Sequence, residues 1–296
     1  MRSLAERLGF DPEARVVIVH ADDVGMTHSH NTGFFEVAAR GIVTCGSVMV
    51  TGPWFPEVVA WARHEPAADL GVHLCLNSEL AGLRWAPVSG AGAVPSLVDR
   101  QGYLWASPSE TLERADPEEV RTELRTQIER AIASGLDVTH LDAHMGTVMM
   151  GNLFEIYLDL GREFRVPVFL PRPTQALLRE VGRADMLEGL EERLAGYESS
   201  GVMMVDHAEL RSLSFDADAA ADHYRRVFSE LLPGVTHFLI HPAAGDDELR
   251  AVMPESWRQR DADRRVFADP ATARWLDESG VRRVGYRQLR DLVRVA

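Results

Sequence analysis

Two adjacent carboxylates near the start of the chain most directly indicate chemistry. Asp22 and Asp23 follow the apolar run Val16–Val19, and Gly25 comes two residues later. Neighbouring carboxylates can diverge, so that one binds a cation while the other accepts a proton. Aspartate is also common in turns, so the pair alone is equally compatible with a simple strand-to-loop turn.

Three histidines occupy comparable places further along the chain. His73 is near the end of one apolar run, His144 follows another, and His241 ends a third. Each alone is more often a structural residue. Together with the aspartate pair they form a set in which two imidazoles and one carboxylate bind a divalent ion and leave a position for water. The remaining histidine and aspartate would then transfer protons.

The elements that must position these residues are predicted to be strands alternating with helices, the pattern of an α/β fold. The run before Asp22 is short, β-branched and continuously apolar, which is typical of a parallel strand covered on both faces. Seven or eight such strands close most naturally into a TIM-like (β/α) barrel, whose strand ends converge on one face. Further strands are predicted at 42–51, 70–76, 138–142, 166–170, 202–205, 236–240 and 281–286, and helices at 31–40, 56–64, 116–134, 154–164, 218–232 and from 287.

Residues 77–117 interrupt this alternation. The stretch is rich in glycine, proline and serine, contains Trp85 and Trp105, and lacks periodicity. Long irregular insertions in compact domains are more often lids or binding loops than plain surface excursions. We therefore expect residues 1–296 to form a single (β/α)-barrel domain with an irregular insertion at 77–117.

Composition limits the class of protein. The 296 residues are 46% hydrophobic with a formal net charge of −14, which is typical of a globular protein and argues against nucleic-acid binding. No window approaches the roughly 18 apolar residues of a membrane span, and the first ten residues lack a signal-peptide core. Cys45 and Cys75 are interpreted as buried thiols, so a cytoplasmic protein is expected. A homodimer, the commonest assembly, is compatible with the chain.

The motifs together resemble those of a known family. In chain order, residues 20–25 (His-Ala-Asp-Asp-Val-Gly), 71–74 (Gly-Val-His-Leu), 139–144 (Thr-His-Leu-Asp-Ala-His) and 241–242 (His-Pro) resemble the motifs of the YdjC/ChbG-like carbohydrate deacetylases. Asn31 and the segments 41–44 and 285–289 are also similar to this family. The resemblance covers nearly the whole chain.

This resemblance implies a distorted TIM-like barrel that removes the acetyl group from N-acetylated sugars with one divalent metal ion. It implies that Asp23, His73 and His144 bind the metal, that Asp22 is the general base and that His241 is the catalytic acid. Amide hydrolysis does require a polarised carbonyl, an activated water and a proton for the amine. Zinc suits two histidines and an aspartate, with magnesium, nickel, cobalt or iron as alternatives. The implied substrate is an N-acetylglucosamine-type sugar, a short chitooligosaccharide or a glycoconjugate.

Two departures from the family pattern lie beside the predicted site. The first family motif commonly reads Asn-Ala-Asp-Asp-Phe-Gly, whereas this chain has His20 and Val24. Many members have another histidine where this chain has Gly146. The predicted ligands do not depend on that residue, but its absence changes how the acyl group or the sugar is held.

Other polar residues are weaker candidates. Arg172 and His207, at the ends of the predicted fifth and sixth strands, could contact the substrate. His28 and His30 are interpreted as surface or helix-start residues. His140 is expected to face away from the ligand side of its strand.

Two other classes of function stay open. A sugar isomerase or a phosphoesterase could use the same ligands, although the chain is poor in lysine and lacks an evident basic clamp. A barrel that has lost activity could bind a sugar or a partner protein. Loss of activity usually removes the base and the acid first, yet Asp22 and His241 are both present.

Overall fold

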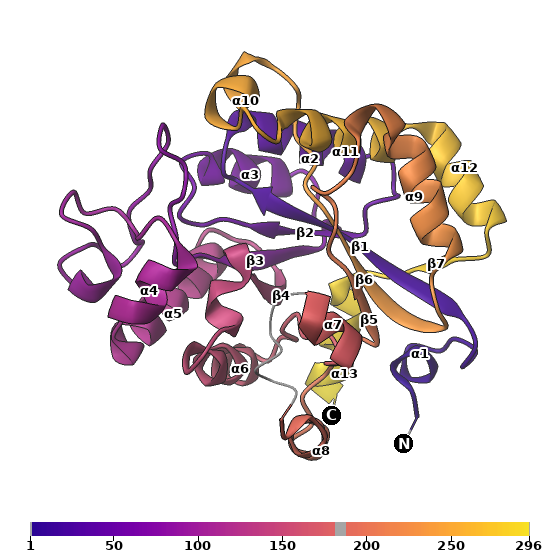
Figure 1. Cartoon of the computed structure of the whole chain (residues 1–296), viewed down its shortest axis with the longest axis horizontal. Helices are drawn as coiled ribbons and strands as arrows, with labels where there is room; N and C mark the ends of the chain where they lie inside the picture. The colour runs from indigo at the N-terminus through magenta and orange to yellow at the C-terminus, as the bar shows by residue number, and fades with distance from the viewer. Residues whose placement is uncertain (1, 181–187, 296) are drawn as a thin grey trace.

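The computed structural model describes residues 2–180 and 188–295, and at its centre a parallel sheet curls into a barrel (Figure 1). The main path of the sheet has the order β4-β3-β2-β1-β6-β5, and β7 pairs with the first half of β1. The strands are β1 (Arg15–Val24), β2 (Cys45–Val48), β3 (Leu70–Leu74), β4 (Val138–Ala143), β5 (His207–Glu209), β6 (Gly234–Ile240) and β7 (Arg282–Arg283).

The outer strands β4 and β5 are connected through single bridges. Leu141 of β4 pairs with Val168, and Pro171 pairs with Val205, just before β5. The ring therefore closes through residues 168–171. The predicted fold class is confirmed as a distorted (β/α) barrel of six to seven parallel strands.

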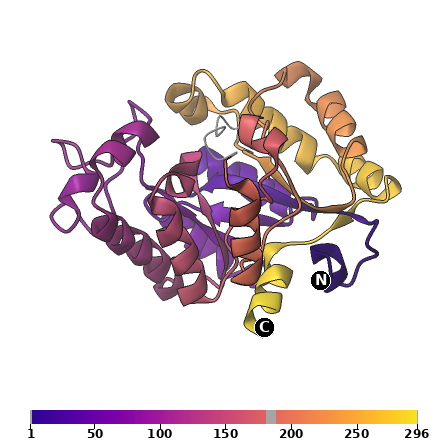
Figure 2. The same ribbon diagram turned by 60° about the horizontal axis from the view of Figure 1, so that its bottom comes forward.

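Helices surround the sheet, as a second view shows (Figure 2). None of them, within the described ranges, is long and apolar enough to cross a membrane. They are α1 (Leu4–Arg7), α2 (His28–Ala38), α3 (Phe55–Ala62), α4 (Pro108–Arg114), α5 (Pro117–Ala133), α6 (Leu153–Phe164), α7 (Gln175–Glu180), α8 (Leu190–Ser199), α9 (Ala220–Ser229), α10 (Asp247–Val252), α11 (Trp257–Ala268), α12 (Pro270–Glu278) and α13 (Tyr286–Val295), with 3₁₀ turns η1 (Pro95–Leu97), η2 (His144–Met149) and η4 (Ala217–Ala219).

Helix α5 illustrates why the predicted helices form where they do. The side chain of Asp116 accepts hydrogen bonds from the first backbone N–H groups, and Pro117 occupies the first turn, where it has no N–H to satisfy. Gly135 follows the helix with φ of +94°, a conformation that glycine adopts readily. Leu124 and Ile128, four residues apart, are fully buried, and burial of each stabilises the fold by about 1.5–3 kcal/mol.

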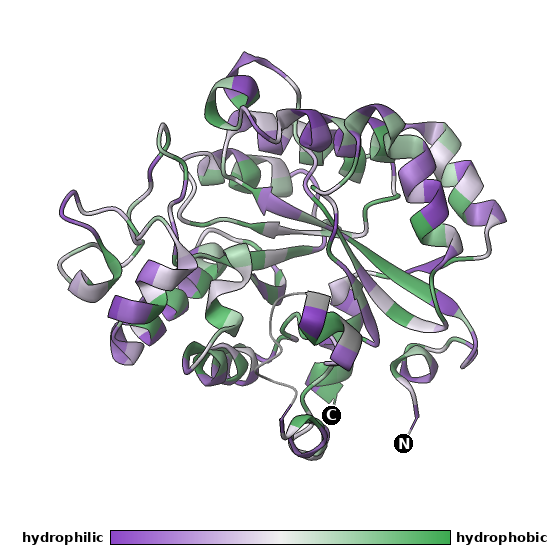
Figure 3. Cartoon of the chain, viewed as in Figure 1, coloured by the Kyte–Doolittle hydropathy of each residue, from purple (hydrophilic) through white to green (hydrophobic). Residues whose placement is uncertain are grey.

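Along β1, the side chains on one face change from apolar at the start of the strand to polar at its end. Val16 and Ile18 belong to an interior cluster that includes Leu4 of α1 and Leu289 of α13. His20 and Asp22 continue the same face of the strand, because side chains on one face recur every second residue. Figure 3 shows this strand as hydrophobic along most of its length and hydrophilic at its tip. The apolar end fixes the strand, and its far end presents the polar groups.

Most predicted elements are confirmed, and two of the three strands that differ lie where the barrel closes. The strand predicted at 202–205 is wrong, because those residues are mostly buried but pair only at Val205, and β5 begins at His207. The strand predicted at 166–170 pairs there only at Val168. The one predicted at 281–286 shrinks to β7, since α13 begins at Tyr286. Helices α1, α4, α7, α8, α10, α11 and α12 were not predicted.

Candidate active site

Both carboxylates of the aspartate pair reach one site because the backbone between them is irregular. Neighbouring strand residues normally point to opposite faces. Asp23 has φ of +65°, and the pairing of β1 with β2 shifts register between Ala21 and Val24. Aspartate is among the few residues that tolerate this left-handed backbone. As a result, Asp23 Oδ1 and Asp22 Oδ2 lie 3.4 and 3.8 Å from the same nitrogen, His73 Nε2.

The turn after the pair is held by Asn31. Its Oδ1 accepts a hydrogen bond from the backbone N–H of Gly25 at 2.7 Å, and its Nδ2 donates to Trp54 O and Glu57 Oε2. Gly25 has φ of +95°, and a Cβ there would lie 3.1 Å from Met49 O. Both residues belong to segments that the family resemblance singled out, and together they fix the end of β1.

Asp23, His73 and His144 place three donor atoms around one point. His73 Nε2 and His144 Nδ1 lie 3.4 and 3.3 Å from Asp23 Oδ1, and the two nitrogens are 3.3 Å apart. Tetrahedral ligands about 2.0–2.1 Å from a zinc ion are themselves separated by about 3.3 Å. The donor set therefore fits one divalent ion and leaves a fourth position for water or substrate.

A carboxylate orients each histidine through the nitrogen that faces away from the metal position. His73 Nδ1 lies 2.9 Å from Asp142 Oδ1, and Asp142 Oδ2 accepts a hydrogen bond from Ser47 Oγ. His144 Nε2 lies 3.0 Å from Glu79 Oε2. Such pairs are typical of metal-ligating histidines. Neither carboxylate was predicted as a site residue, although Asp142 lies within the 139–144 motif.

We expect Glu79→Gln to weaken metal binding by about 10- to 100-fold, because the imidazole of His144 loses the carboxylate that orients it. Titration against a chromophoric chelator at fixed pH measures this change. Glu113→Gln is a matched control in the same insertion, since Glu113 is 70% exposed on α4. Equal metal affinity in Glu79→Gln and wild type would show that Glu79 does not support the ligand.

Arg260 determines how the two oxygens of Asp23 are used. Its guanidinium donates to Asp23 Oδ2 at 2.7 Å, which leaves Oδ1 facing the two histidines. Burial alone would raise the pKa of Asp23. The positive charge of Arg260 and hydrogen bonds from His144 and His73 instead hold this pKa well below its usual value. Asp23 is therefore ionised, as a metal ligand must be.

The two histidine ligands hold protons in the absence of an ion. Burial lowers the pKa of His73, but the carboxylates of Asp142 and Asp22 outweigh it and raise that pKa well above its ordinary value. Glu79 does the same for His144. A metal ion has to displace these protons, so metal affinity rises with pH.

Asp22 lies beside the triangle of donor atoms without belonging to it. Its Oδ2 is 3.8 Å from His73 Nε2 and 3.9 Å from His241 Nε2. Its Oδ1 is 2.8 Å from His20 Nδ1, but among the described residues neither of these two atoms has an aligned hydrogen-bond partner. Burial raises the pKa of Asp22, which suits a carboxylate that accepts a proton.

His241 is held from both its backbone and its ring. Its backbone N–H donates to Asp263 Oδ2 at 2.8 Å, and its Nδ1 lies 2.7 Å from Ser212 Oγ, which is also 3.1 Å from Asp263 Oδ2. Burial and the charge of Arg260 lower the pKa of His241 to about 3, so the resting ring is neutral at pH 7. Burial raises the pKa of Asp263 to about 7.

Beneath the site, a row of polar side chains runs through the barrel interior. His20 Nε2 lies 2.8 Å from His140 Nε2, His140 Nδ1 lies 2.9 Å from Thr139 Oγ1, and the Thr139 hydroxyl donates to Asp69. Asp69 immediately precedes β3, so it lies at the end of the barrel opposite the site. The expectation that His140 faces away is wrong. It shares the inward face of Asp142, two residues along the strand, and lies one layer deeper.

The two weaker strand-end candidates lie outside this cluster. Arg172 forms an ion pair with Glu198 at 2.7 Å, and both side chains are 40% exposed. His207 begins β5, whereas the site lies where the strands end, and its Nε2 is 3.0 Å from Pro233 O. The placement of His207 at a strand end was therefore wrong.

His28 and His30 both lie in the first turn of α2, as expected. His28 is half exposed and pairs with Glu57 at 2.9 Å. His30 is buried, and its Nε2 lies 3.2 Å from the Arg260 guanidinium. Both therefore fit the interpretation as surface or helix-start residues, His28 on both counts and His30 as a helix-start residue.

Helix α11 supplies two residues that the sequence analysis missed. Arg260 and Asp263 are three positions apart and therefore share a helix face, from which they contact Asp23 and His241. No motif marks them. The one signal in the sequence that could have indicated them is a pair of opposite charges, three residues apart as on one helix face, in a segment of low hydropathy.

Comparison with known proteins identifies relatives over nearly the whole chain. A family model described as YdjC-like protein matches residues 16–278. A carbohydrate deacetylase from Thermus thermophilus is 35% identical over 278 residues, covering 93% of this chain and 94% of that protein. A carbohydrate deacetylase from Thermoanaerobacter pseudethanolicus is 25% identical, covering 93% of this chain and all of that protein (100%).

A solved structure shares the fold. The crystal structure of an Enterococcus faecalis V583 protein named for cellobiose-phosphate cleavage superposes with a TM-score of 0.75 and 25% identity, covering 93% of this chain and 99% of that one. The family match, the relatives and the fold agree with the order of motifs along the sequence. The chain belongs to the YdjC-like protein family.

Proposed function

We propose that this protein is a metal-dependent hydrolase that removes the acetyl group from an N-acetylated sugar or glycoconjugate. The observation that carries the proposal is the triangle formed by Asp23, His73 and His144, with Asp22 and His241 beside it. The names of the two bacterial relatives support this reaction class. In this proposal, residues 1–296 form one barrel domain, and the insertion at 77–117 contributes Glu79 to the site.

The three proposed ligands would hold one divalent ion, and we propose zinc because the spacing of the donor atoms suits tetrahedral coordination. When bound, the ion polarises the amide carbonyl and makes a water molecule more acidic. Arg260 keeps Asp23 ionised, and the carboxylates of Asp142 and Glu79 keep the two imidazoles turned toward the ion.

The proton transfers fall to Asp22 and His241. Asp22 accepts a proton from the attacking water, because its buried carboxylate lies beside the ligands and has a raised pKa. His241 delivers a proton to the leaving amine. Since its pKa of about 3 leaves the resting ring neutral, His241 must first receive that proton. Asp22 Oδ2, 3.9 Å from His241 Nε2, is placed to supply it.

The alternatives receive less support from these contacts. A phosphoesterase needs a second cation or a basic clamp, whereas the arginine beside the ligands, Arg260, is already paired with Asp23. A barrel that only binds a ligand needs neither a base nor an acid. Asp22 and His241 nevertheless face each other beside the metal position.

A panel of N-acetyl sugars assayed with zinc, magnesium, nickel, cobalt or iron tests the proposed function. The expected result is release of acetate and free amine in equal amounts. The chain contains no lysine, so an amine-reactive dye labels only the N-terminal amine of the protein and reports the freed amino sugar directly. Absence of acetate release from every sugar with every metal would contradict the proposal.

We expect His241→Ala to lose about 10²–10⁴-fold in turnover on the amide, the usual contribution of general acid–base catalysis. It should recover much of its activity on an activated aryl ester, because a phenolate leaves without a proton. Parallel kcat/KM measurements on both substrates check this, with His207→Ala as the control. Equal loss on amide and ester would indicate that His241 instead orients the substrate or stabilises the oxyanion.

We also propose a cellular location and an oligomeric state for the protein. Cys45 and Cys75 are both buried and free, which supports a reducing, cytoplasmic location. A homodimer is proposed as the commonest assembly. Light scattering at several concentrations decides between monomer and dimer.

A further inference from the structure

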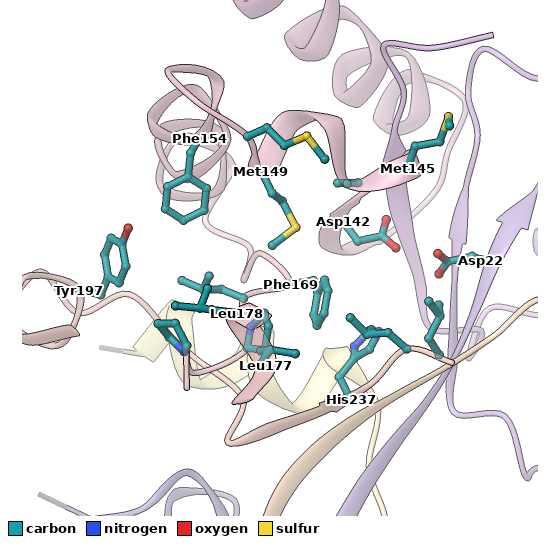
Figure 4. A pocket seen from close by; sticks show the side chains of 18 residues that line it. Asp22, Asp142, Met145, Met149, Phe154, Phe169, Leu177, Leu178, Tyr197 and His237 are labelled. Carbon is teal, nitrogen blue, oxygen red and sulfur yellow. The ribbon is translucent and has the colours of Figure 1, made fainter. Parts of the chain in front are cut away.

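A cavity of about 360 Å³ opens beside Asp22. It extends from the carboxylates of Asp22 and Asp142 at one end to the rings of Phe154 and Tyr197 at the other (Figure 4). The site therefore adjoins a space much larger than the methyl group of an acetamide.

The wall of this cavity is predominantly apolar. Its apolar side chains include Met145 and Met149 of η2, Leu177 of α7, and Phe169, which precedes α7 (Figure 4). Burial of a sugar hydroxyl against such a wall without a hydrogen-bond partner would be unfavourable by several kcal/mol. The part of a ligand that enters this cavity is therefore apolar.

Of the four polar side chains in the wall, Asp22, Asp142, Tyr197 and His237, two are engaged elsewhere. Asp142 binds His73 through one oxygen and Ser47 through the other. His237 Nδ1 is hydrogen-bonded to Tyr286. They offer little to the several hydroxyl groups of a sugar ring.

The position of His241 identifies which part of the substrate enters. His241 is not among the residues that line the cavity, whereas Asp22 is. The leaving amine, and the sugar that carries it, must lie beside His241 to receive a proton. The substituent on the other side of the amide carbon is the acyl chain, and the cavity lies on the Asp22 side.

We propose that the cavity binds the acyl chain of the substrate, and that the preferred substrates are N-acyl amino sugars with a linear chain of about six to eight carbons. This inference rests on the proposed function and specifies its substrate class. An apolar cavity of about 150 Å³ accommodates benzene, so 360 Å³ has room for a chain of this length. An acetyl group would leave most of the apolar space to poorly bonded water.

Gly146 contributes to this space. It lines the cavity, and a Cβ at this position would meet nothing closer than Met150 Cε at 4.0 Å. The neighbouring residues in this chain, Met145, Met149 and Met150, have flexible apolar side chains that adapt to an acyl chain.

A chain-length series tests the inference. Zinc-loaded wild-type protein is assayed on glucosamine carrying acetyl, butanoyl, hexanoyl or octanoyl groups, with the freed amine as readout. Each buried methylene is expected to raise kcat/KM about three- to fourfold until the cavity is full. Hexanoyl glucosamine has four more methylenes than acetyl glucosamine and should therefore exceed it by about 80- to 250-fold.

A variant that fills the cavity tests whether the preference for longer acyl chains arises there. Leu177→Trp occupies the middle of the cavity and should lower the ratio of kcat/KM for hexanoyl to acetyl by about tenfold or more. Leu232→Trp is the matched control, because Leu232 is 60% exposed and lies outside the cavity. Calorimetric titration of wild-type protein with hexanoate and with acetate adds a readout independent of turnover. Only hexanoate is expected to bind measurably.

Failure of this inference can be distinguished from failure of the proposed function. If wild-type protein releases amine from the acetyl substrate but its activity falls steadily with chain length, the inference is wrong and the proposed function stands. An unchanged ratio in a folded Leu177→Trp, or equal binding of acetate and hexanoate, would also overturn it. If no substrate of the glucosamine series is hydrolysed with zinc, the inference fails, and the proposed function is decided by the wider panel of N-acetyl sugars and metals.

Discussion

Substitution of any one of the three proposed metal ligands is expected to remove bound metal and turnover together. His73→Ala and His144→Ala each leave two donors around a position that needs three, and an open site cannot retain its ion with two. Asp23→Asn replaces the anionic oxygen with a neutral amide, which is a much weaker metal donor. The loss of affinity should exceed the 10- to 100-fold that removal of an outer carboxylate causes. Metal content per chain after desalting, together with acetate release, measures both effects.

Asparagine is the informative replacement at Asp23. With φ of +65° at this position, alanine would add backbone strain to the loss of a ligand, whereas asparagine tolerates the left-handed region. His28→Ala is the control, since His28 is half exposed and outside the site. A full equivalent of metal in all three ligand variants would refute the assignment.

Metal retention in the wild-type protein should also depend on pH. The raised pKa values of His73 and His144 mean that both rings carry protons near neutral pH unless an ion displaces them. Apparent metal affinity should therefore fall as pH is lowered. In His73→Ala one of these protons is absent, so the pH dependence of any residual binding should be shallower.

Asp22→Asn is expected to keep its metal and lose about 10²–10⁴-fold in turnover. The amide has nearly the same shape as the carboxylate but cannot accept a proton. Because burial raises the pKa of Asp22, the activity of the wild-type protein should fall toward acid pH as this group becomes protonated. With metal held in saturating excess at every pH, that limb should disappear in the variant.

Metal content and a pH–rate profile, measured side by side, check this prediction for Asp22. Asp247→Asn provides the matched change at a fully exposed position, where no effect is expected. Unchanged turnover in Asp22→Asn would reduce Asp22 to a residue of the turn. Loss of metal would instead make it a ligand.

The strands that carry the proposed ligands and base were predictable because each has a strong local signal. The run before Asp22 and the segments that contain His73 and His241 are short, apolar and bounded by turn residues. Val202–Val205 has the same local signal, yet it pairs only at Val205. Burial alone makes a run apolar, and hydropathy cannot distinguish a buried strand from a buried irregular segment.

The contribution of α11 could not be read from the sequence. The inward face of a helix is normally recognised by apolar residues, but here that face carries Arg260 and Asp263. Their burial is stabilised by partners that are distant in sequence: Asp23 is separated from Arg260 by 237 positions. Local periodicity contains no information about such pairs. The motif residues were found because they recur with a family pattern, whereas Arg260, Asp263 and Glu79 lie outside that pattern.

Protons in the row of side chains from Asp22 to Asp69 cannot be placed independently of one another. A neutral imidazole carries one proton, so the nitrogen that holds it in His20 decides which nitrogen holds it in His140. If Asp22 is ionised, the proton of His20 lies on Nδ1, 2.8 Å from Asp22 Oδ1. His140 then donates to His20, Thr139 donates to His140, and Asp69 has to be the protonated carboxyl. If Asp69 is ionised, every donor reverses and Asp22 carries the proton. When the rings of His20 and His140 are both neutral, Asp22 and Asp69, at opposite ends of the barrel, share one proton. Protonation of one carboxyl therefore requires ionisation of the other.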